Sequence, residues 1–328
     1  MLDPEIILHS SFAKPLIANP INYVDIGARG GFQEDLLPIS FCVNAVGFEP
    51  DPKEFAVLEK KATSPWRSQQ ILPYGISAHG GKKSLYIPDD PLGASLLRPN
   101  PQVCDPFNKS QFFKVREEIQ IDTRVLSEVL KEIGVTGPDY LKLDIEGAEH
   151  QVLETLKALF AGISMIKVEV SFMPFREGHP VASEIERFMN SHGFQLIDIV
   201  GATHWRFHGN ITHPFLSKEE IPYSRAQLVH GDYLFLRSFE TLDFKSDTGR
   251  RHAFKVGVLA MAFGYFDSAS RIFLVEEMLE WLSDKGVDDV KNTLHTISVA
   301  YGRAAFRHSF LNQIRGLFPF LRRISHAF

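Results

Sequence analysis

Between residue 21 and about residue 237, short apolar runs alternate with segments whose apolar residues recur every three or four positions. This alternation predicts strands joined by helices, as in a mostly parallel sheet. The predicted strands lie near residues 21–26, 43–49, 70–76, 139–144, 163–171, 194–199 and 232–237. The predicted helices lie near residues 51–63, 124–134, 148–161 and 180–192. We therefore expect an α/β domain over residues 21–240, after a short lead-in at residues 1–20.

Three segments of this region do not follow the alternation. Residues 82–88 alternate in polarity like an edge hairpin. Residues 89–116 are rich in proline and asparagine, and we predict a long irregular loop there. A second long connection is predicted at residues 200–230. Connections of this length are usually functional or disordered.

Beyond about residue 245 no strand pattern returns. Helices are predicted at residues 253–266, 268–285, 288–307 and 309–326, with Pro319 breaking the last one. We interpret residues 245–328 as a helical region that covers one face of the sheet.

Composition narrows the classes of function. The 328-residue chain has a formal net charge of −5 and a pI near 6.2, which give no overall attraction to nucleic acid. Its two cysteines, Cys42 and Cys104, form no C-x-x-C pair, so neither a zinc site nor a disulfide framework is expected. The N-terminus lacks the features of a signal peptide, and no apolar run is long enough to predict a membrane span. We expect a cytoplasmic protein.

A glycine-rich turn follows the first predicted strand, in the segment Tyr23-Val-Asp-Ile-Gly-Ala-Arg-Gly-Gly31. The second predicted strand ends at Glu49, roughly 20 residues further on. In doubly wound folds, small residues after the first strand let the backbone approach a ligand, and an acid after the second binds ribose hydroxyls. The spacing Asp25-x-Gly27-x-Arg29-x-Gly31 differs from the G-x-G-x-x-G of dinucleotide-binding proteins. It therefore disfavours a nicotinamide-dependent oxidoreductase and resembles the first motif of S-adenosylmethionine-dependent methyltransferases.

Five motifs together resemble the FkbM-type family of S-adenosylmethionine-dependent methyltransferases. They are Asp25-Ile-Gly-Ala28, Gly47-Phe-Glu-Pro-Asp-Pro52, Gly93-Ala-Ser-Leu-Leu97, Leu141-Lys-Leu-Asp-Ile-Glu-Gly-Ala-Glu149 and Val168-Glu-Val-Ser-Phe172. The resemblance covers about residues 20–237 and leaves out residues 245–328. It implies a class I methyltransferase fold, a Rossmann-like seven-stranded sheet whose last strand is antiparallel, with S-adenosylmethionine bound over strands one and two.

The resemblance also implies roles for individual residues. The methionine end of the cofactor pocket would be shaped by Asp25, Gly27, Ala28 and Gly31. Glu49 would bind the ribose, residues around Ser77 would face the adenine, and Asp144 and Glu146 would sit beside the reacting methyl group. Where the family has asparagine, this chain has Arg29, whose guanidinium could pair with the cofactor carboxylate or turn outward to solvent.

A base would assist the attack of a sugar hydroxyl on the methyl group. Asp144 has the position for this role, but an ordinary carboxylate is a weak base unless it is partly desolvated. Histidine titrates closer to neutral pH, and three candidates follow the fifth and sixth strands: His179, His204 and His208. Asp144, Glu169 and a histidine could also hold a hard divalent ion. The sequence leaves the metal unassigned.

Each candidate also has a purely structural interpretation. Asp25 suits a turn, whereas Glu49 and Glu146 could simply be acids near helix N-termini. The acceptor wall is predicted to include residues 93–100 and the segment Trp205-Arg206-Phe207, which ordinary loop packing would explain equally well.

The tail from Phe310 to Phe328 is basic and rich in aromatic residues. It could lie on an anionic membrane surface at the inner face of the membrane. It could instead pack against the catalytic domain or a second subunit, and we favour packing or a homo-oligomer.

The sequence thus predicts an O-methyltransferase that acts on a hydroxyl of a sugar, a glycan or a related small molecule, without a nucleic-acid partner. The alternative is a non-catalytic binding protein on the same fold, with the helical tail recruiting a partner. The presence of Asp25, Gly27, Glu49 and Asp144 argues against a decayed cofactor pocket.

Overall fold

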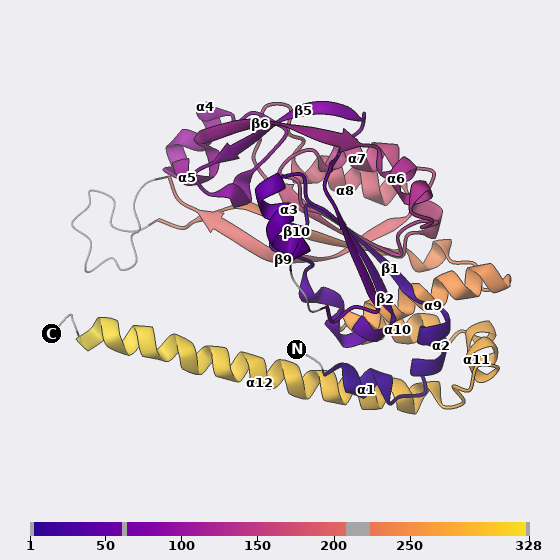
Figure 1. The fold of residues 1–328 in the computed structure, drawn as a ribbon. Coiled ribbons are helices and arrows are strands. Elements are labelled where there is room, and N and C mark those ends of the chain that lie inside the picture. Colours follow the sequence, from indigo (N-terminus) through magenta and orange to yellow (C-terminus); the bar gives the residue numbers. More distant parts are fainter. Residues whose placement is uncertain (1–2, 61–63, 208–223, 326–328) are drawn as a thin grey trace.

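The computed structural model describes residues 3–60, 64–207 and 224–325. Its centre is a seven-stranded sheet with the strand order β3-β2-β1-β7-β8-β10-β9 (Figure 1). The strands are β1 (Ile21–Ile26), β2 (Val43–Phe48), β3 (Ser68–Leu72), β7 (Tyr140–Leu143), β8 (Met165–Ser171), β9 (Phe194–Trp205) and β10 (Gln227–Arg237). β10 runs antiparallel to both of its neighbours, β8 and β9, and the other pairs are parallel. The expected fold class, including the antiparallel last strand in the sequence, is confirmed.

A second, three-stranded sheet was not predicted. It consists of β4 (Gly75–Ile76), β6 (Val115–Arg124) and β5 (Gly81–Pro88), in the order β4-β6-β5. The predicted strand at residues 70–76 is therefore two short strands in different sheets. The sequence pattern did not predict β6, because charged and polar residues occupy most of its exposed positions.

The predicted loop at residues 89–116 is partly ordered into single turns. They are η2 (Pro91–Gly93), α4 (Pro101–Cys104), η3 (Asp105–Phe107) and α5 (Ser110–Phe113). β9 and β10 are longer than predicted, so the connection expected at residues 200–230 is confined to residues 206–226. The turns between Pro91 and Phe113 contribute residues that border the candidate site.

Side chains alternate between the two faces of each central strand. Leu141 and Ile166 point to the face covered by α6 (Leu126–Glu132), α7 (Glu149–Thr155) and α8 (Ala182–Ser191). Tyr140 and Met165, one position earlier, point to the opposite face. α3 (Pro52–Glu59) follows β2 and starts at an Asp51 side chain that accepts a hydrogen bond from Lys53 N. These four helices lie where the pattern predicts them, although each is shorter.

Helices from both ends of the chain cover the opposite face of the sheet. The sequence predicted only the C-terminal part of this cover. The N-terminal part supplies α1 (Pro4–Leu8), α2 (Ala13–Ala18) and η1 (Glu34–Cys42), and the C-terminal part supplies α9 (Asp247–Ala262), α10 (Phe266–Phe273), α11 (Glu276–Ser283) and α12 (Val290–Ser325). Phe12, Phe254 and Phe273 pack together at the centre of this layer. The C-terminal helices therefore complete the core of the sheet.

The bounds of the C-terminal helices differ from the prediction. α9 begins six residues earlier, because the Ser246 side chain accepts a hydrogen bond from Gly249 N and caps it. The predicted helix at 268–285 is divided into α10 and α11, and the last two predicted helices form the single helix α12. The predicted break at Pro319 is wrong: the missing N–H removes one hydrogen bond without ending the helix. Among the described residues, no helix has both the length and the apolar content that a membrane span requires.

Candidate functional site

The turn after β1 touches the turn after β7. Gly27 has a φ of +91°, and a β-carbon at this position would lie 1.9 Å from the carbonyl oxygen of Asp144. Only glycine can occupy this position without moving the neighbouring strand end. The contact brings the predicted cofactor turn against the acid that ends β7.

A cavity lies over the ends of β1 and β2, and we call it the nucleoside cavity. Its lining consists of Ile26, Gly27, Arg29, Phe48, Glu49, Pro50, Gly75, Ile76, Leu85, Pro91, Ala94, Ser95, Leu96, Ile121 and Ile145. The walls are mostly apolar, and Glu49 is its carboxylate. This combination matches a nucleoside, whose flat base needs apolar contacts and whose ribose hydroxyls need an acceptor.

Glu49 is almost fully buried, with 2% of its surface exposed. One carboxylate oxygen, Oε1, accepts a hydrogen bond of 2.8 Å from Asp51 N. Burial raises the pKa of Glu49 to about 7, although that hydrogen bond and Arg29 act in the opposite direction. The structure thus brings this predicted ribose ligand into the cavity.

Arg29 does not turn outward to solvent. Its Nη2 donates to Asp51 Oδ2 at 2.8 Å and lies 3.9 Å from Glu49 Oε1. The side chain is 19% exposed and forms part of the cavity wall. The guanidinium also holds the pKa of Asp51 below its usual value, against the effect of burial. Pairing of Arg29 with a cofactor carboxylate stays a prediction.

Six predicted cofactor residues do not line the nucleoside cavity: Asp144 and Glu146, which belong to a second cavity, and the four described next. Ala28 is fully buried and packs close to Gly47, and Gly31 is the last glycine of the turn, with a φ of +107°. Ser77 hydrogen-bonds through Oγ to the carbonyl of His79 and to Thr123, and its neighbour Ile76 reaches the cavity instead. Asp25 is fully buried and paired within the protein.

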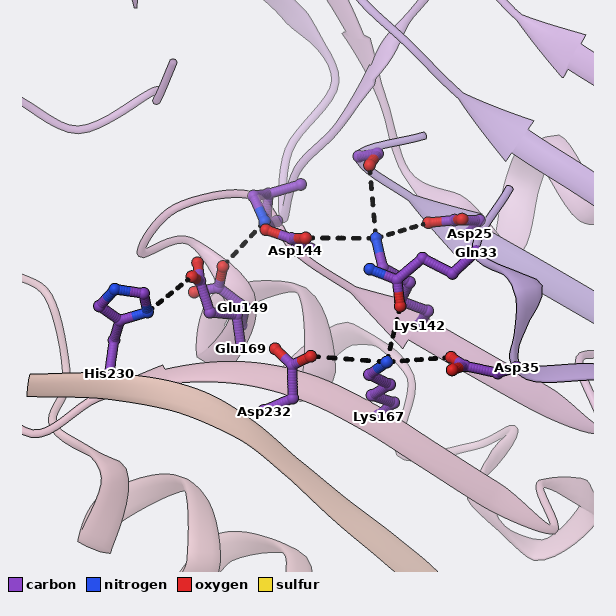
Figure 2. Close-up of polar contacts among 12 residues, drawn as sticks. Asp25, Gln33, Asp35, Lys142, Asp144, Glu149, Lys167, Glu169, His230 and Asp232 are labelled. Carbon is purple, nitrogen blue, oxygen red and sulfur yellow. Dashed lines mark hydrogen bonds and ion pairs between the residues drawn. The ribbon is translucent and has the colours of Figure 1, made fainter. Parts of the chain in front are cut away.

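Two buried lysines form ion pairs at the centre of the sheet, next to the turn that follows β1 (Figure 2). Lys142 Nζ lies 3.0 Å from Asp25 Oδ1 and 3.3 Å from Asp144 Oδ2. Burial alone would lower the pKa of Lys142, but the two carboxylates outweigh it and raise this pKa. On the adjacent strand, Lys167 Nζ lies 3.0 Å from Asp35 Oδ2 and 3.5 Å from Asp232 Oδ2. Both lysines are therefore positive charges held between acids.

A second cavity of about 270 Å³ lies beyond Asp144, and we call it the acid-lined cavity. Its lining consists of Leu92, Gly93, Phe112, Phe113, Asp144, Glu146, Glu169, Ser171, Phe175, Arg176, Trp205 and His230. Segments 91–96 and 144–146 contribute to both cavities, so the two adjoin. The lining combines carboxylates with aromatic side chains.

The acidic turn after β7 is held in an unusual conformation. Glu146 has a φ of +61°, a left-handed conformation that costs a non-glycine residue about 1–2 kcal/mol. Its carboxylate lies 2.7 Å from Arg176 Nη2, and its carbonyl accepts a hydrogen bond from Ser95 Oγ at 2.7 Å. Buried Glu149 accepts hydrogen bonds from the N–H groups of Ile145 and Gly147. Burial raises the pKa of Glu146 to about 7.

The histidine that reaches the acid-lined cavity is His230, which the sequence reasoning did not single out. It lies on β10, and its Nδ1 is 3.5 Å from Glu169 Oε1 on β8. Burial, with Arg176 acting in the same direction, lowers the pKa of His230 despite the nearby Asp144. The imidazole is therefore neutral at pH 7 and can accept a proton.

Of the predicted histidines, His179 and His204 lie elsewhere. His204 is exposed on β9, and it faces away from the cavity because the adjacent Trp205 lines it. His179 packs against Gly147, and burial lowers its pKa to about 4. His208 lies outside the described residues. The structure thus brings together Asp144 and Glu146 from the predicted set, and His230 lies beside them where neither His179 nor His204 does.

Carboxylate oxygens of Asp144, Glu146 and Glu169 lie within 4.8 Å of one another. Such a group could hold a hard divalent ion. Two of the three carboxylates already have cationic partners, Lys142 and Arg176. These ion pairs account for much of the negative charge, and we assign no metal to the group.

Aromatic side chains form one wall of the acid-lined cavity. Trp205 contacts Phe112, Phe113 and Phe175, with ring centroids 5.3–6.1 Å apart. Phe207, from the same predicted wall, stacks on Phe107 and is 48% exposed. Arg206 is not part of the cavity lining. The predicted segment 93–100 reaches both cavities through residues 93–96.

Lys142, Lys167, Arg176 and His230 were missed as site residues. For the two lysines the sequence did contain a signal: each sits in the middle of an apolar strand, where a buried charge must find a partner. The sequence contained no such signal for Arg176 and His230. Arg176 contacts Glu146 and His230 contacts Glu169, and each contact joins residues that are far apart in the chain.

The methyltransferase FkbM domain matches residues 25–196 of this chain. A comparison with the curated proteins finds no match. Several solved structures match the chain, among them three whose likeness is weak. The first is magnesium protoporphyrin IX methyltransferase from Synechocystis PCC 6803 with bound SAM, which has 9% identity and a TM-score of 0.33, over 72% of this chain and 78% of that one. The second is a putative RNA methyltransferase from Pyrococcus horikoshii, with 11% identity and a TM-score of 0.30, over 72% of this chain and 84% of that one. The third is a putative tRNA (m1A22) methyltransferase from Streptococcus pneumoniae in complex with S-adenosyl-L-methionine, with 11% identity and a TM-score of 0.27, over 91% of this chain and 100% of that one. At these scores the likeness carries no argument about the substrate.

Proposed function

This chain belongs to the FkbM family of S-adenosylmethionine-dependent methyltransferases, and we propose that it methylates a hydroxyl group of a sugar, a glycan or a related hydroxylated small molecule. The observation that carries this proposal is the acid-lined cavity, which adjoins the nucleoside cavity along segments 91–96 and 144–146. Carboxylates and an imidazole can accept hydrogen bonds from several hydroxyl groups, and aromatic faces suit the apolar faces of a sugar ring.

The residues of the nucleoside cavity fit the cofactor. Glu49 is a buried carboxylate whose Oε1 is engaged by the backbone, which leaves acceptor capacity on the carboxylate for ribose hydroxyls. Phe48 and Ile121 offer apolar surface to the adenine. Gly27 lets the backbone come close to the methionine end. When bound, S-adenosylmethionine supplies a methyl group that is already activated by a sulfonium.

Catalysis by the chain then consists of placing the acceptor oxygen and taking its proton. His230 is the base in this proposal, because it is neutral at pH 7 and lines the cavity. Glu169, 3.5 Å from its Nδ1, orients the imidazole. Asp144, 34% exposed and held by Lys142, accepts a hydrogen bond from the acceptor hydroxyl. Burial, together with the neighbouring acids, keeps the pKa of Glu169 well above its ordinary value.

The non-catalytic alternative finds little support in these residues. A scaffold protein would not need an acid with a pKa near 7 in each of two adjoining cavities. Nor would it need Glu146 in a left-handed conformation, since such strain is usually retained where a site depends on it.

The proposal is tested by methyl transfer from ¹³C-methyl-labelled S-adenosylmethionine to panels of acceptors. Monosaccharides, nucleotide sugars, oligosaccharides and polyketide-like alcohols form the hydroxyl panel, and amines and thiols form the comparison panel. We expect label in a methyl ether, located by NMR, and its formation should be about 10²–10⁴-fold slower with Asp144→Asn. Label on nitrogen or sulfur alone would contradict hydroxyl methylation. Binding of S-adenosylhomocysteine without transfer to any acceptor would favour the non-catalytic alternative.

A further inference from the structure

The last helix, α12, extends away from the rest of the molecule (Figure 1). Its first turns are anchored, because Leu294 and Ile297 are buried in the core layer. Further along, Phe306 is 71% and Phe310 is 53% exposed, and their rings stack on each other with centroids 6.3 Å apart. The described part of the chain therefore leaves two large aromatic side chains of this helix uncovered.

These side chains form a stripe on the outward face. At 3.6 residues per turn, Val299, Phe306 and Phe310 share one face of the helix, opposite the face that carries Leu294 and Ile297. Val299 is also exposed. The apolar surface is thus turned away from the body of the protein, and none of the described residues buries it.

The charge of the segment indicates what covers the stripe. After Asp289 the sequence contains six basic residues and no acidic one, although the whole chain has a formal net charge of −5. Arg303 and Arg307, both exposed, flank Phe306. Two copies of α12 lying side by side would bring these like charges together, whereas anionic lipid headgroups attract each of them. Exposed aromatic residues beside arginines on a long helix are typical of helices that lie in a membrane interface.

We propose that α12 docks the protein onto a bilayer containing anionic phospholipid. Phe306 and Phe310 enter the boundary between headgroups and acyl chains, and Arg303 and Arg307 bind lipid phosphates. This inference is independent of the methyl acceptor, because none of these residues lines either cavity.

Flotation of the full-length protein with vesicles tests the proposal. We expect binding to phosphatidylcholine vesicles that contain phosphatidylglycerol, weaker binding as salt is raised, and little binding to phosphatidylcholine alone. Arg303→Gln with Arg307→Gln should lower the partition coefficient about 25-fold, at roughly fivefold for each arginine. Phe306→Ser with Phe310→Ser should lower it by about tenfold or more.

Matched controls lie on the catalytic domain. Val57→Ser replaces an exposed apolar residue on α3, 56% exposed, and Arg187→Gln removes an exposed charge on α8. Neither control should change the partition, and circular dichroism should show that all variants are folded. Equal binding by the wild type and the α12 variants would overturn the proposal. Light scattering that shows a lipid-free dimer, broken by the Phe306 and Phe310 substitutions, would assign the stripe to a second copy instead.

Discussion

Lys142 and Asp25 are direct partners across the paired strands β7 and β1, and Lys142 Nζ donates to Asp25 Oδ1 at 3.0 Å. Both side chains are buried, so each charge depends on the other. Lys142 also reaches Asp144, which places one ammonium group between the cofactor turn and the acceptor side of the site (Figure 2).

Lys142→Met should therefore destabilise the protein strongly, because Asp25 would remain buried without its cationic partner. The expected loss is about 3–5 kcal/mol in the free energy of unfolding, measured by urea denaturation. Lys82→Met removes a lysine from an exposed pair with Asp122 and should cost far less. If the two variants lose similar amounts of unfolding free energy, then the buried Lys142–Asp25 pair stabilises the protein no more than the exposed Lys82–Asp122 pair does.

Gly27→Ala should disrupt the site, since a β-carbon would lie 1.9 Å from the carbonyl oxygen of Asp144 and the φ is +91°. We expect a loss of stability of more than about 3 kcal/mol, or loss of cofactor binding where the fold survives. Gly30→Ala is the control: its φ is +77°, but a β-carbon would meet nothing within 4 Å. It should cost only about 1 kcal/mol. The comparison separates the steric clash with Asp144, which only Gly27→Ala creates, from the backbone strain that both substitutions share. Equal losses of stability in the two variants would contradict the close approach of Gly27 to Asp144.

Glu49→Gln should weaken binding of S-adenosylhomocysteine by about 10- to 150-fold in calorimetry, because a charged acceptor for the ribose hydroxyls is lost. Glu59→Gln, on the exposed surface of α3, should leave the affinity unchanged. Unchanged affinity in a folded Glu49→Gln variant would remove Glu49 from the pocket.

The pKa of Glu49, raised to about 7, adds a pH dependence. Binding that requires the ionised carboxylate should strengthen as pH rises through about 7, and this trend should be absent in Glu49→Gln. For folding the sign is opposite. The folded carboxyl holds its proton more tightly than the unfolded one, so its stabilising contribution is lost as pH rises from about 4.5 to about 7. A wild-type affinity that does not vary between pH 6 and 8 (roughly one unit either side of that pKa) would contradict this account.

His230→Ala and Asp144→Asn should each slow methyl transfer by about 10²–10⁴-fold while changing cofactor affinity much less. His204→Ala, on the outward side of β9, should be near wild type. Because burial lowers the pKa of His230, the acid limb of the wild-type kcat/KM profile should lie below pH 6.5, the ordinary histidine value. Near-normal turnover in His230→Ala would move the base role to Asp144, and a collapse of cofactor binding in Asp144→Asn would make it a pocket residue.

Local pattern alone predicted six of the seven strands of the main sheet as single elements, the helical cover and the positions of Gly27, Glu49 and Asp144. These features depend on neighbours in the chain: apolar periodicity, a glycine turn, and an acid that directly follows a strand. Strand β6 was missed because its side chains are mostly polar on an exposed sheet, which leaves no apolar alternation to detect.

Tertiary structure decided which side chains meet. Arg176 reaches Glu146 and His230 reaches Glu169 only because β7, β8 and β10 lie side by side, with the antiparallel β10 returning from the far edge of the sheet. The sequence reasoning chose histidines by their nearness to strand ends, but strand alternation points the exposed His204 to the other face of β9. Sequence by itself thus determined the fold class, and it predicted Gly27, Arg29 and Glu49, which line the nucleoside cavity. The acid-lined cavity came from contacts between distant segments, whose pairing is set by the packing of the whole sheet.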